Sequence, residues 1–221
     1  MSRVFAIGDI HGCCKTFKKL LLEKLAIKKS DKIYCIGDYV DRGKDSKGVI
    51  DFIIQLRNKG YHIHTLRGNH EQMMLDSVKD QHRLNHWLKN GGRETLNSFG
   101  ITSVIELPDK YLKFLKRTKF FIATNKYIFV HAGLDFNIEN PFADKEAMLW
   151  IRDAYFDKSK INDRVLIHGH TPIPLEILRK QTNSNRINID AGCVYLHKPG
   201  FGNLVTLSLP DMQLISINNI D

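Results

Sequence analysis

Four short polar motifs, each following an apolar run, constrain the fold of this chain more than any other feature. Each motif places aspartate, histidine or asparagine next to glycine. The motifs are Gly8–Gly12 (GDIHG), Gly37–Gly43 (GDYVDRG), Leu66–Glu71 (LRGNHE) and the paired histidine stretches Val130–Gly133 (VHAG) and Ile167–Pro172 (IHGHTP). Because ligands in open α/β sheets bind beyond the carboxyl ends of the strands, the motifs indicate one site built at the ends of several strands.

The apolar pattern of the first 71 residues alternates between strands and helices. Val4–Ile7, Lys32–Ile36 and Tyr61–Leu66 are short apolar runs typical of strands, and Cys13–Leu25 carries apolar residues at helical spacing. A second helix is expected to begin with Ser46 as its cap. This order predicts a βαβαβ unit with a parallel sheet.

The remaining sequence continues the mixed pattern. Residues 71–117 are expected to be mostly helical, broken at Gly91–Gly92 and Gly100. Further strands are predicted at 120–123, 127–130, 165–167 and 186–189, followed by a hairpin of 203–209 and 212–217. The predicted fold is a mixed α/β domain spanning residues 1–221, with two packed β-sheets flanked by helices.

Composition places the chain among ordinary globular proteins. The 221 residues are 43% hydrophobic and 26% charged, and no apolar run approaches the roughly 20 residues needed to cross a bilayer. The segment from Met1 to Ile7 reaches a glycine too soon to hold the apolar part of a signal peptide. The four cysteines lack the spacing of a disulfide framework. We therefore expect a cytoplasmic protein without a membrane partner.

The net charge of +9 raises the question of nucleic-acid binding. The lysines are scattered, and no zinc-finger spacing or aromatic RNA-binding signature accompanies them. We therefore favour a solvated surface that attracts anions in general over a nucleic-acid groove. Such a surface would also help to capture a phosphorylated substrate.

The polar motifs supply a set of ligands for two metal ions. Asp9 and His11 are two residues apart, so their side chains point the same way in an extended segment. The first ion is assigned Asp9, His11 and Asp38, and the second Asp38, Asn69, His131 and His170. A shared carboxylate suits a pair of ions about 3.5–4 Å apart, as in two-metal hydrolases. Carboxylate, imidazole and amide ligands suit manganese, iron or zinc, with manganese as our first choice.

The combined motifs resemble the phosphoprotein phosphatase family of calcineurin-like metallophosphoesterases, above all its short bacterial and phage serine/threonine phosphatases. The resemblance covers Gly8 to Pro172. It implies the same six ligands and direct attack on phosphorus by a hydroxide that bridges the ions. It also implies His70 as the general acid and Asp41 as the residue that orients His70.

Two arginines are implied to bind phosphate oxygens. Arg42 belongs to the second motif, and its guanidinium matches phosphate geometry. The second arginine of the family lies after the His-Ala-Gly motif. Arg152 is our candidate for it, and Arg164 is the rival.

The resemblance leaves the substrate open. The main expectation is a phosphatase for phosphoserine and phosphothreonine in proteins, with phosphotyrosine as a further possibility. The alternative is hydrolysis of dinucleoside polyphosphates such as diadenosine tetraphosphate, which we rank second because such relatives tend to be longer. A non-catalytic scaffold has only the net charge in its favour. The chain lacks the extended C-terminal region of eukaryotic members, so no regulatory subunit is expected.

Several other residues have simpler interpretations. Trp87 and Trp150 are expected as core aromatics, and His82 and His86 as a polar helix face. His168 could orient a ligand or be an ordinary strand residue. Glu71 is a candidate for holding part of the site in place.

Overall fold

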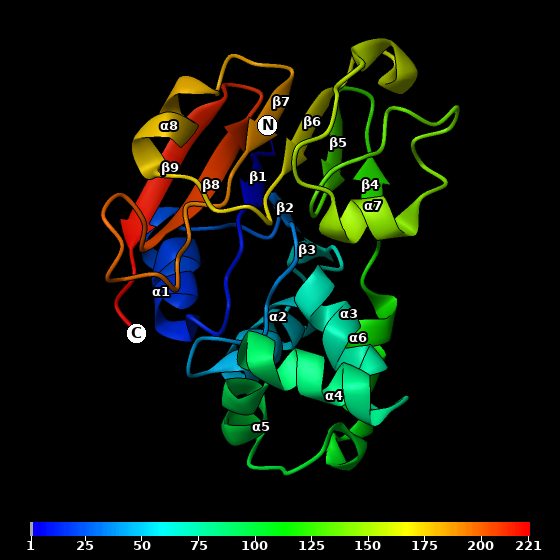
Figure 1. Cartoon of the computed structure of the whole chain (residues 1–221). Coiled ribbons are helices and arrows are strands. Elements are labelled where there is room, and N and C mark those ends of the chain that lie inside the picture. The colour runs from blue at the N-terminus through cyan, green and yellow to red at the C-terminus, as the bar shows by residue number, and fades with distance from the viewer. Residues whose placement is uncertain (1) are drawn as a thin grey trace.

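The computed structural model describes residues 2–221, and Met1 lies outside the described residues (Figure 1). One sheet has the strand order β3-β2-β1-β8-β9 and the other β4-β5-β6-β7. The first contains β1 (Val4–Ile7), β2 (Lys32–Cys35), β3 (His62–Thr65), β8 (Asn203–Leu209) and β9 (Gln213–Asn218). The second contains β4 (Phe121–Ala123), β5 (Tyr127–Val130), β6 (Val165–His168) and β7 (Arg186–Asn188). The predicted mixed α/β fold with two sheets is confirmed.

The two sheets pack through a shared apolar layer. Tyr34 of β2 stacks on Phe129 of β5 with ring centroids 4.2 Å apart. The same buried cluster contains Ala6 from the first sheet and Ile167 and Ile187 from the second. Burial of this layer from both sides explains why the strands read as continuous apolar runs.

Parallel pairing brings the ends of the strands together. β1 pairs with β2 and β2 with β3 in parallel, as the βαβαβ prediction requires. In the second sheet β5, β6 and β7 are also parallel. The carboxyl ends of neighbouring strands therefore lie at a common edge in each sheet, and the polar motifs follow directly after them.

Most helices lie at one end of the molecule, below the sheets in Figure 1. The α-helices are α1 (Cys14–Lys19), α2 (Ser46–Asn58), α3 (Asn69–Asp76), α4 (Gln81–Trp87), α5 (Arg93–Phe99), α6 (Asp109–Arg117), α7 (Lys145–Trp150) and α8 (Leu175–Lys180). Shorter segments are η1 (Leu20–Lys24), η2 (Leu88–Gly92), η3 (Val104–Glu106) and η4 (Lys158–Ile161). The six-residue helices α7 and α8 were not predicted, because fewer than two turns show little periodicity.

The cap of α2 corrects one prediction. Asp45, not Ser46, is the cap, and its side chain accepts the backbone N–H of Gly48 at 2.8 Å. The hydroxyl of Ser46 instead turns inward and accepts the backbone N–H of Asp41 at 3.1 Å. The change gives Ser46 a role at the site rather than at the helix end.

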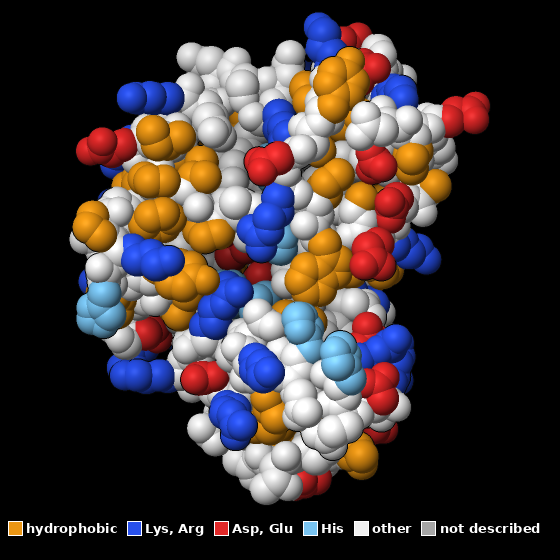
Figure 2. Space-filling model, in the orientation of Figure 1, with side chains coloured by type: hydrophobic (Ala, Val, Ile, Leu, Met, Phe, Trp, Pro, Cys, Tyr) orange, Lys and Arg blue, Asp and Glu red, His pale blue; other side chains and the backbone are white. Residues whose placement is uncertain are grey.

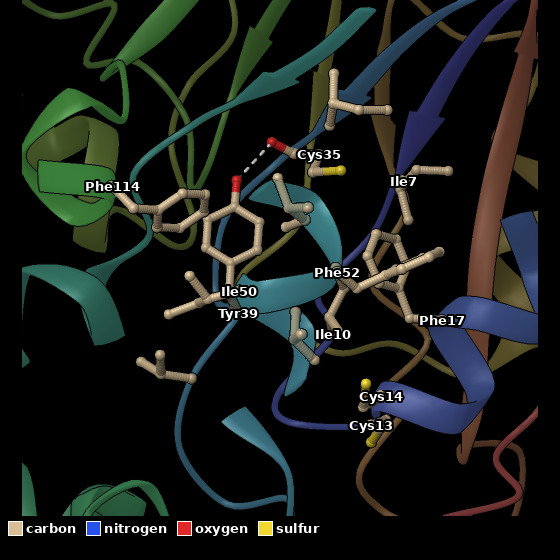
Figure 3. Packing of buried hydrophobic residues seen from close by; sticks show 14 of the residues in the cluster. Ile7, Ile10, Cys13, Cys14, Phe17, Cys35, Tyr39, Ile50, Phe52 and Phe114 are labelled. Carbon is tan, nitrogen blue, oxygen red and sulfur yellow. Dashed lines mark hydrogen bonds between the residues drawn. The ribbon is translucent and has the colours of Figure 1, made fainter. Parts of the chain in front are cut away.

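The largest buried cluster lies between the first sheet and the helices α1 and α2 (Figure 3). Phe17 and Phe52 meet edge to face with centroids 5.6 Å apart. The hydroxyl of Tyr39 donates to the carbonyl oxygen of Cys35 at 3.0 Å, the bond drawn in Figure 3. Cys35 is a buried free thiol, as its apolar run predicts. Tyr39 and Val40 of the second motif belong to this cluster, so the core anchors the loop Gly37–Gly43.

Among residues 2–221, no helix combines the length and apolar character that crossing a membrane requires.

Candidate metal centre and active site

The predicted ligands converge from five different strand ends. Asp9 and His11 follow β1, and Asp38 follows β2. Asn69 begins α3 just beyond β3, His131 follows β5, and His170 follows β6. All six are at least 93% buried, with His170 the most exposed at 7%. The structure therefore brings together every ligand that the motifs predict.

Asp38 lies between the two halves of this cluster. Its Oδ2 is 3.3 Å from Nε2 of His11, and its Oδ1 is 3.5 Å from Nε2 of His131. Two triads have ligand atoms that all lie within 4.8 Å of one another: His11, Asp38 and His70, and Asp38, His131 and His170. Both triads contain Asp38, as expected of a carboxylate shared by two ions.

The facing atoms are acceptors, which favours cations between them. Nδ1 of His11 lies 2.9 Å from the carbonyl oxygen of Val40, and Nδ1 of His131 lies 3.1 Å from that of Ile36. A carbonyl only accepts, so each Nδ1 carries the proton and each Nε2 presents a lone pair to Asp38. Burial lowers the pKa of His131 to about 3, so this ring is neutral at pH 7. Lone pairs directed at a carboxylate fit a bound metal ion.

Asn69 and Asp9 complete the set. Oδ1 of Asn69 lies 2.9 Å from Nε2 of His131 and 3.0 Å from Nδ1 of His170. Oδ2 of Asp9 accepts the backbone N–H of His170 at 3.1 Å, while its Oδ1 is buried without a hydrogen-bond partner in residues 2–221. A buried carboxylate oxygen without a donor fits a cation.

Asp190, which follows β7, is a buried acid that the sequence analysis missed. Burial raises the pKa of Asp9, and the charges of Asp190 and Asp38 raise it further. Burial likewise raises the pKa of Asp190 to about 7. Three carboxylates gathered away from water are unfavourable without positive charge, so they also fit a divalent centre. The only signal for Asp190 in the sequence was an Asp-Ala-Gly after an apolar run, which is the pattern of the other motifs.

His70 forms a buried pair with Asp41. Nδ1 of His70 lies 2.7 Å from Oδ2 of Asp41, and Nε2 faces Asp38 at 4.0 Å. Burial lowers the pKa of His70 to about 4 and raises the pKa of Asp41 to about 8. Donors from Trp87 and Thr95 oppose the effect on Asp41. The pair can hold a proton and keeps Nε2 directed at the centre, which a proton donor requires.

The expected core position is confirmed for Trp87, whereas Trp150 is only partly buried against the same cluster. Trp87 is fully buried, but its Nε1 donates to Asp41 at 2.9 and 3.0 Å. Trp150 is only half-buried, and its ring centroid lies 6.2 Å from that of His170. His82 and His86 are exposed on α4, as predicted, and line a cavity of about 710 Å³ beside Trp150.

Glu71 holds the loop of the second motif. Its carboxylate accepts backbone N–H groups of Asp38 at 2.9 Å, Tyr39 at 2.7 Å and Gly68 at 2.8 Å. A Cβ at Gly68 would collide with the carboxylate of Asp38. Glu71 and Gly68 thus fix the position of Asp38.

The structure separates the three candidate arginines. Arg42 Nη1 donates to Nε2 of His11 at 2.7 Å, so its guanidinium lies at the centre. Arg152 Nη1 donates to the hydroxyl of Thr171 at 3.0 Å. Burial is the largest cause of the lowered pKa of His131 and His170, and the charge of Arg152 is one of the smaller causes. Arg164 donates to the carbonyl of its own segment at Ile161 and lies over Phe142. Of the two rivals, Arg152 is the one beside the metal site.

His168, left open by the sequence, does not contact the proposed ligands by any hydrogen bond in the described residues. Its Nε2 accepts from Nε of Arg186 at 3.2 Å, and its Nδ1 lies 3.4 Å from the carbonyl of Gly169. Its described side-chain partner is therefore Arg186 rather than a proposed ligand.

The backbone is strained where the site is built. Nine non-glycine residues among 2–221 have positive φ, and five of them are site residues. These five are His11 (44°), Asp38 (50°), Asp41 (71°), Arg42 (68°) and His170 (70°). Left-handed backbone costs of order 1–3 kcal/mol at such residues and clusters at functional sites. Figure 2 shows a hollow on this face of the molecule, with red and pale-blue side chains at its floor and blue ones on its rim.

Comparison with known proteins shows the family and the fold of the chain. The sequence profile of the calcineurin-like phosphoesterases matches residues 2–201. The asymmetrical bis(5'-nucleosyl)-tetraphosphatase PrpE of Anoxybacillus flavithermus is 26% identical over 239 residues, covering 96% of this chain and 92% of that protein. Serine/threonine-protein phosphatase 2 of Salmonella typhimurium is 28% identical over 200 residues, covering 86% and 87%. The solved structure of a putative diadenosine tetraphosphatase superimposes with a TM-score of 0.70 and 22% identity, covering 100% of this chain and 95% of that one.

Chain length does not separate the two activities, contrary to the sequence-based argument. The chain spans only 43% and 38% of two other relatives, a symmetrical tetraphosphatase and a serine/threonine phosphatase. The asymmetrical tetraphosphatase is nevertheless covered almost completely. With the profile matching 200 residues and the donor set assembled, the chain belongs to the calcineurin-like phosphoesterase family.

Proposed function

We propose that this chain hydrolyses dinucleoside tetraphosphates by cleaving one of their phosphoanhydride bonds. The observation that carries the proposal is the alignment with an asymmetrical bis(5'-nucleosyl)-tetraphosphatase over 96% of this chain. This reverses the order of the two substrates expected from the sequence, where length was the deciding argument. A hollow with basic side chains on its rim and divalent ions bound at its floor would suit a substrate with four consecutive phosphates.

The proposed site contains two divalent ions, with manganese as our first choice, held by the six predicted ligands around Asp38. Such ions supply an activated water and neutralise the charge on the phosphate oxygens. In this account Arg42 and Arg152 bind the phosphate oxygens that carry the remaining charge. His70 donates a proton to the leaving oxygen, and Asp41 holds His70 in the orientation needed.

Phosphoprotein hydrolysis is the second candidate. It is supported by the match to a serine/threonine-protein phosphatase over 86% of this chain. The same ligands and the same proton donor would serve a phosphoserine or phosphothreonine side chain.

The four cysteines, all buried free thiols, support a reducing, cytoplasmic location for either activity.

A substrate panel tests the proposal. Metal-reconstituted protein would be given diadenosine tetraphosphate and a phosphoserine peptide at matched concentrations, with products separated by chromatography. We expect faster turnover of diadenosine tetraphosphate, and ATP with AMP as products if cleavage is asymmetrical. A higher kcat/KM for the phosphopeptide would reject the first candidate in favour of the second.

A further inference from the structure

A polar cavity of about 650 Å³ lies beside the metal site on the side of the second sheet. We name it the Arg152 cavity, after a lining residue whose charge also acts on His131 and His170. Ala132 and Thr171 form part of its wall, and each directly follows a proposed ligand, His131 or His170. The volume falls within the range typical of small-molecule sites. The cavity is therefore a place where the rest of a bound substrate could extend from the metal centre.

The charged residues that line the cavity are two arginines and one acid, Asp153, so its formal charge is positive. Arg152 uses one of its five N–H groups, in the bond to Thr171, among the contacts within residues 2–221. The guanidinium of Arg186 donates to His168 and to the carbonyl oxygens of Ala154 and Arg152. Arg186 thus fixes the loop that carries Arg152 and still has unused N–H groups in the described contacts. This arrangement suits an anionic group rather than an apolar one.

An aromatic side chain stands at the rim. Tyr155 lines the cavity and is 64% exposed, unusually open for a large aromatic residue. Gln181, at the end of α8, adds an amide side chain to the lining of the cavity. A flat ring next to arginines and an amide offers stacking and hydrogen bonds to one ligand. These are the contacts that a nucleoside attached to a phosphate needs.

We propose that the Arg152 cavity binds a nucleoside of the substrate, with its base on Tyr155 and its adjoining phosphate against Arg152. This inference rests on the proposed function, because it assigns a place to one half of a dinucleoside tetraphosphate. It goes further by naming Tyr155 as the residue that lets the site discriminate nucleotides from other phosphate esters. A phosphopeptide has no base to place on Tyr155.

Equilibrium binding measures the nucleoside contribution without catalysis. Isothermal titration calorimetry on the full chain would compare α,β-methylene-ADP with methylenediphosphonate, which carry the same P–C–P unit and differ by the nucleoside. We expect the nucleotide analogue to bind more tightly to the unaltered protein. Tyr155→Ala should weaken it by roughly 5- to 150-fold, the range for loss of one stacked base, and leave methylenediphosphonate unchanged.

Two further variants serve as controls. Tyr155→Phe keeps the ring and should retain the affinity of the unaltered protein. Leu22→Ala removes another exposed apolar side chain, 50% exposed, that does not line the cavity, and should have no effect. Equal affinity of the two ligands, or equal loss of both in Tyr155→Ala, would overturn the nucleoside assignment.

The outcome also separates this inference from the proposed function. If the protein prefers phosphopeptides but binds the nucleotide analogue through Tyr155, the nucleoside assignment holds and the proposed activity is rejected. If the protein cleaves diadenosine tetraphosphate and Tyr155→Ala leaves its KM unchanged, the proposed activity holds and the nucleoside assignment is rejected.

Discussion

The indole Nε1 of Trp87 donates to the carboxylate of Asp41, at 2.9 Å from Oδ2 and 3.0 Å from Oδ1. Oδ2 of the same carboxylate holds Nδ1 of His70 at 2.7 Å. The hydroxyl of Thr95 donates to Oδ1 at 2.7 Å. The buried Trp87 therefore helps to orient His70, the proposed proton donor, through Asp41.

Trp87→Phe tests this relationship. It removes the hydrogen bond and keeps most of the buried ring. Bonds to charged groups contribute about 1.5–3 kcal/mol, so we expect kcat to fall by about 10- to 100-fold with a substrate whose leaving group needs a proton. Turnover of p-nitrophenyl phosphate, whose leaving group departs without one, should fall much less. Equal losses on both substrates would show that Trp87 acts only on stability.

His70→Asn tests the proton donor itself. The side chain loses its ability to carry a proton while the six proposed ligands remain. We expect turnover to fall by about 10²- to 10⁴-fold, measured by steady-state kinetics. Metal content by elemental analysis should stay close to that of the unaltered protein. A variant that keeps full turnover would remove His70 from the mechanism.

Arg152→Ala and Arg164→Ala form a matched pair. Arg152 lies beside the proposed ligands, whereas Arg164 is bound to the carbonyl of Ile161. Loss of a charge-assisted contact to phosphate should cost about 1.5–3 kcal/mol, which corresponds to about 10- to 100-fold weaker inhibition by inorganic phosphate in Arg152→Ala. Inorganic phosphate should inhibit Arg164→Ala as strongly as it inhibits the unaltered protein. The opposite ranking would transfer the role to Arg164.

Asp31 provides a stability prediction away from the site. Its buried carboxylate accepts from the backbone and the guanidinium of Arg3 and from the backbone of Lys28. Burial alone would raise the pKa of Asp31, but these donors hold it below its ordinary value of 3.8. Asp31→Asn should lower the free energy of unfolding by about 2 kcal/mol, measured by urea denaturation at pH 7.

The pH dependence of that effect has a definite sign. Since the folded pKa of Asp31 is lowered, its stabilising effect is present above the unfolded value and is lost as the pH falls through the folded one. The difference between Asp31→Asn and the unaltered protein should therefore shrink below about pH 4. A difference that grows on acidification would contradict the assigned contacts.

The sequence predicts the sheet and the convergence of the six proposed ligands because both depend on local signals. The apolar runs that form β1, β2 and β3 end in glycine-flanked polar residues, so the fold and the six ligands are visible together. Helices α7 and α8 are too short to show a period, and the cap of α2 depends on which of two adjacent polar residues is already helical.

The supporting contacts of the site could not be predicted, because they join distant segments. Trp87 and Asp41 are 46 residues apart, and nothing in an apolar aromatic indicates a polar partner. Asp190 approaches Asp9 only through the packing of the two sheets. The positive φ of His11 and Asp38 could not be predicted either, because this conformation is uncommon in non-glycine residues, although Asp and His adopt it more often than most.

The central claim is that Asp38 is shared by two divalent ions. Counting the manganese ions bound per chain, by elemental analysis after reconstitution and removal of free metal, tests it most directly. The account predicts two ions for the unaltered protein and loss of both in Asp38→Asn, with Asp135→Asn, in a loop outside the proposed ligand set, retaining two. A single ion in the unaltered protein, or two ions retained by Asp38→Asn, would contradict it.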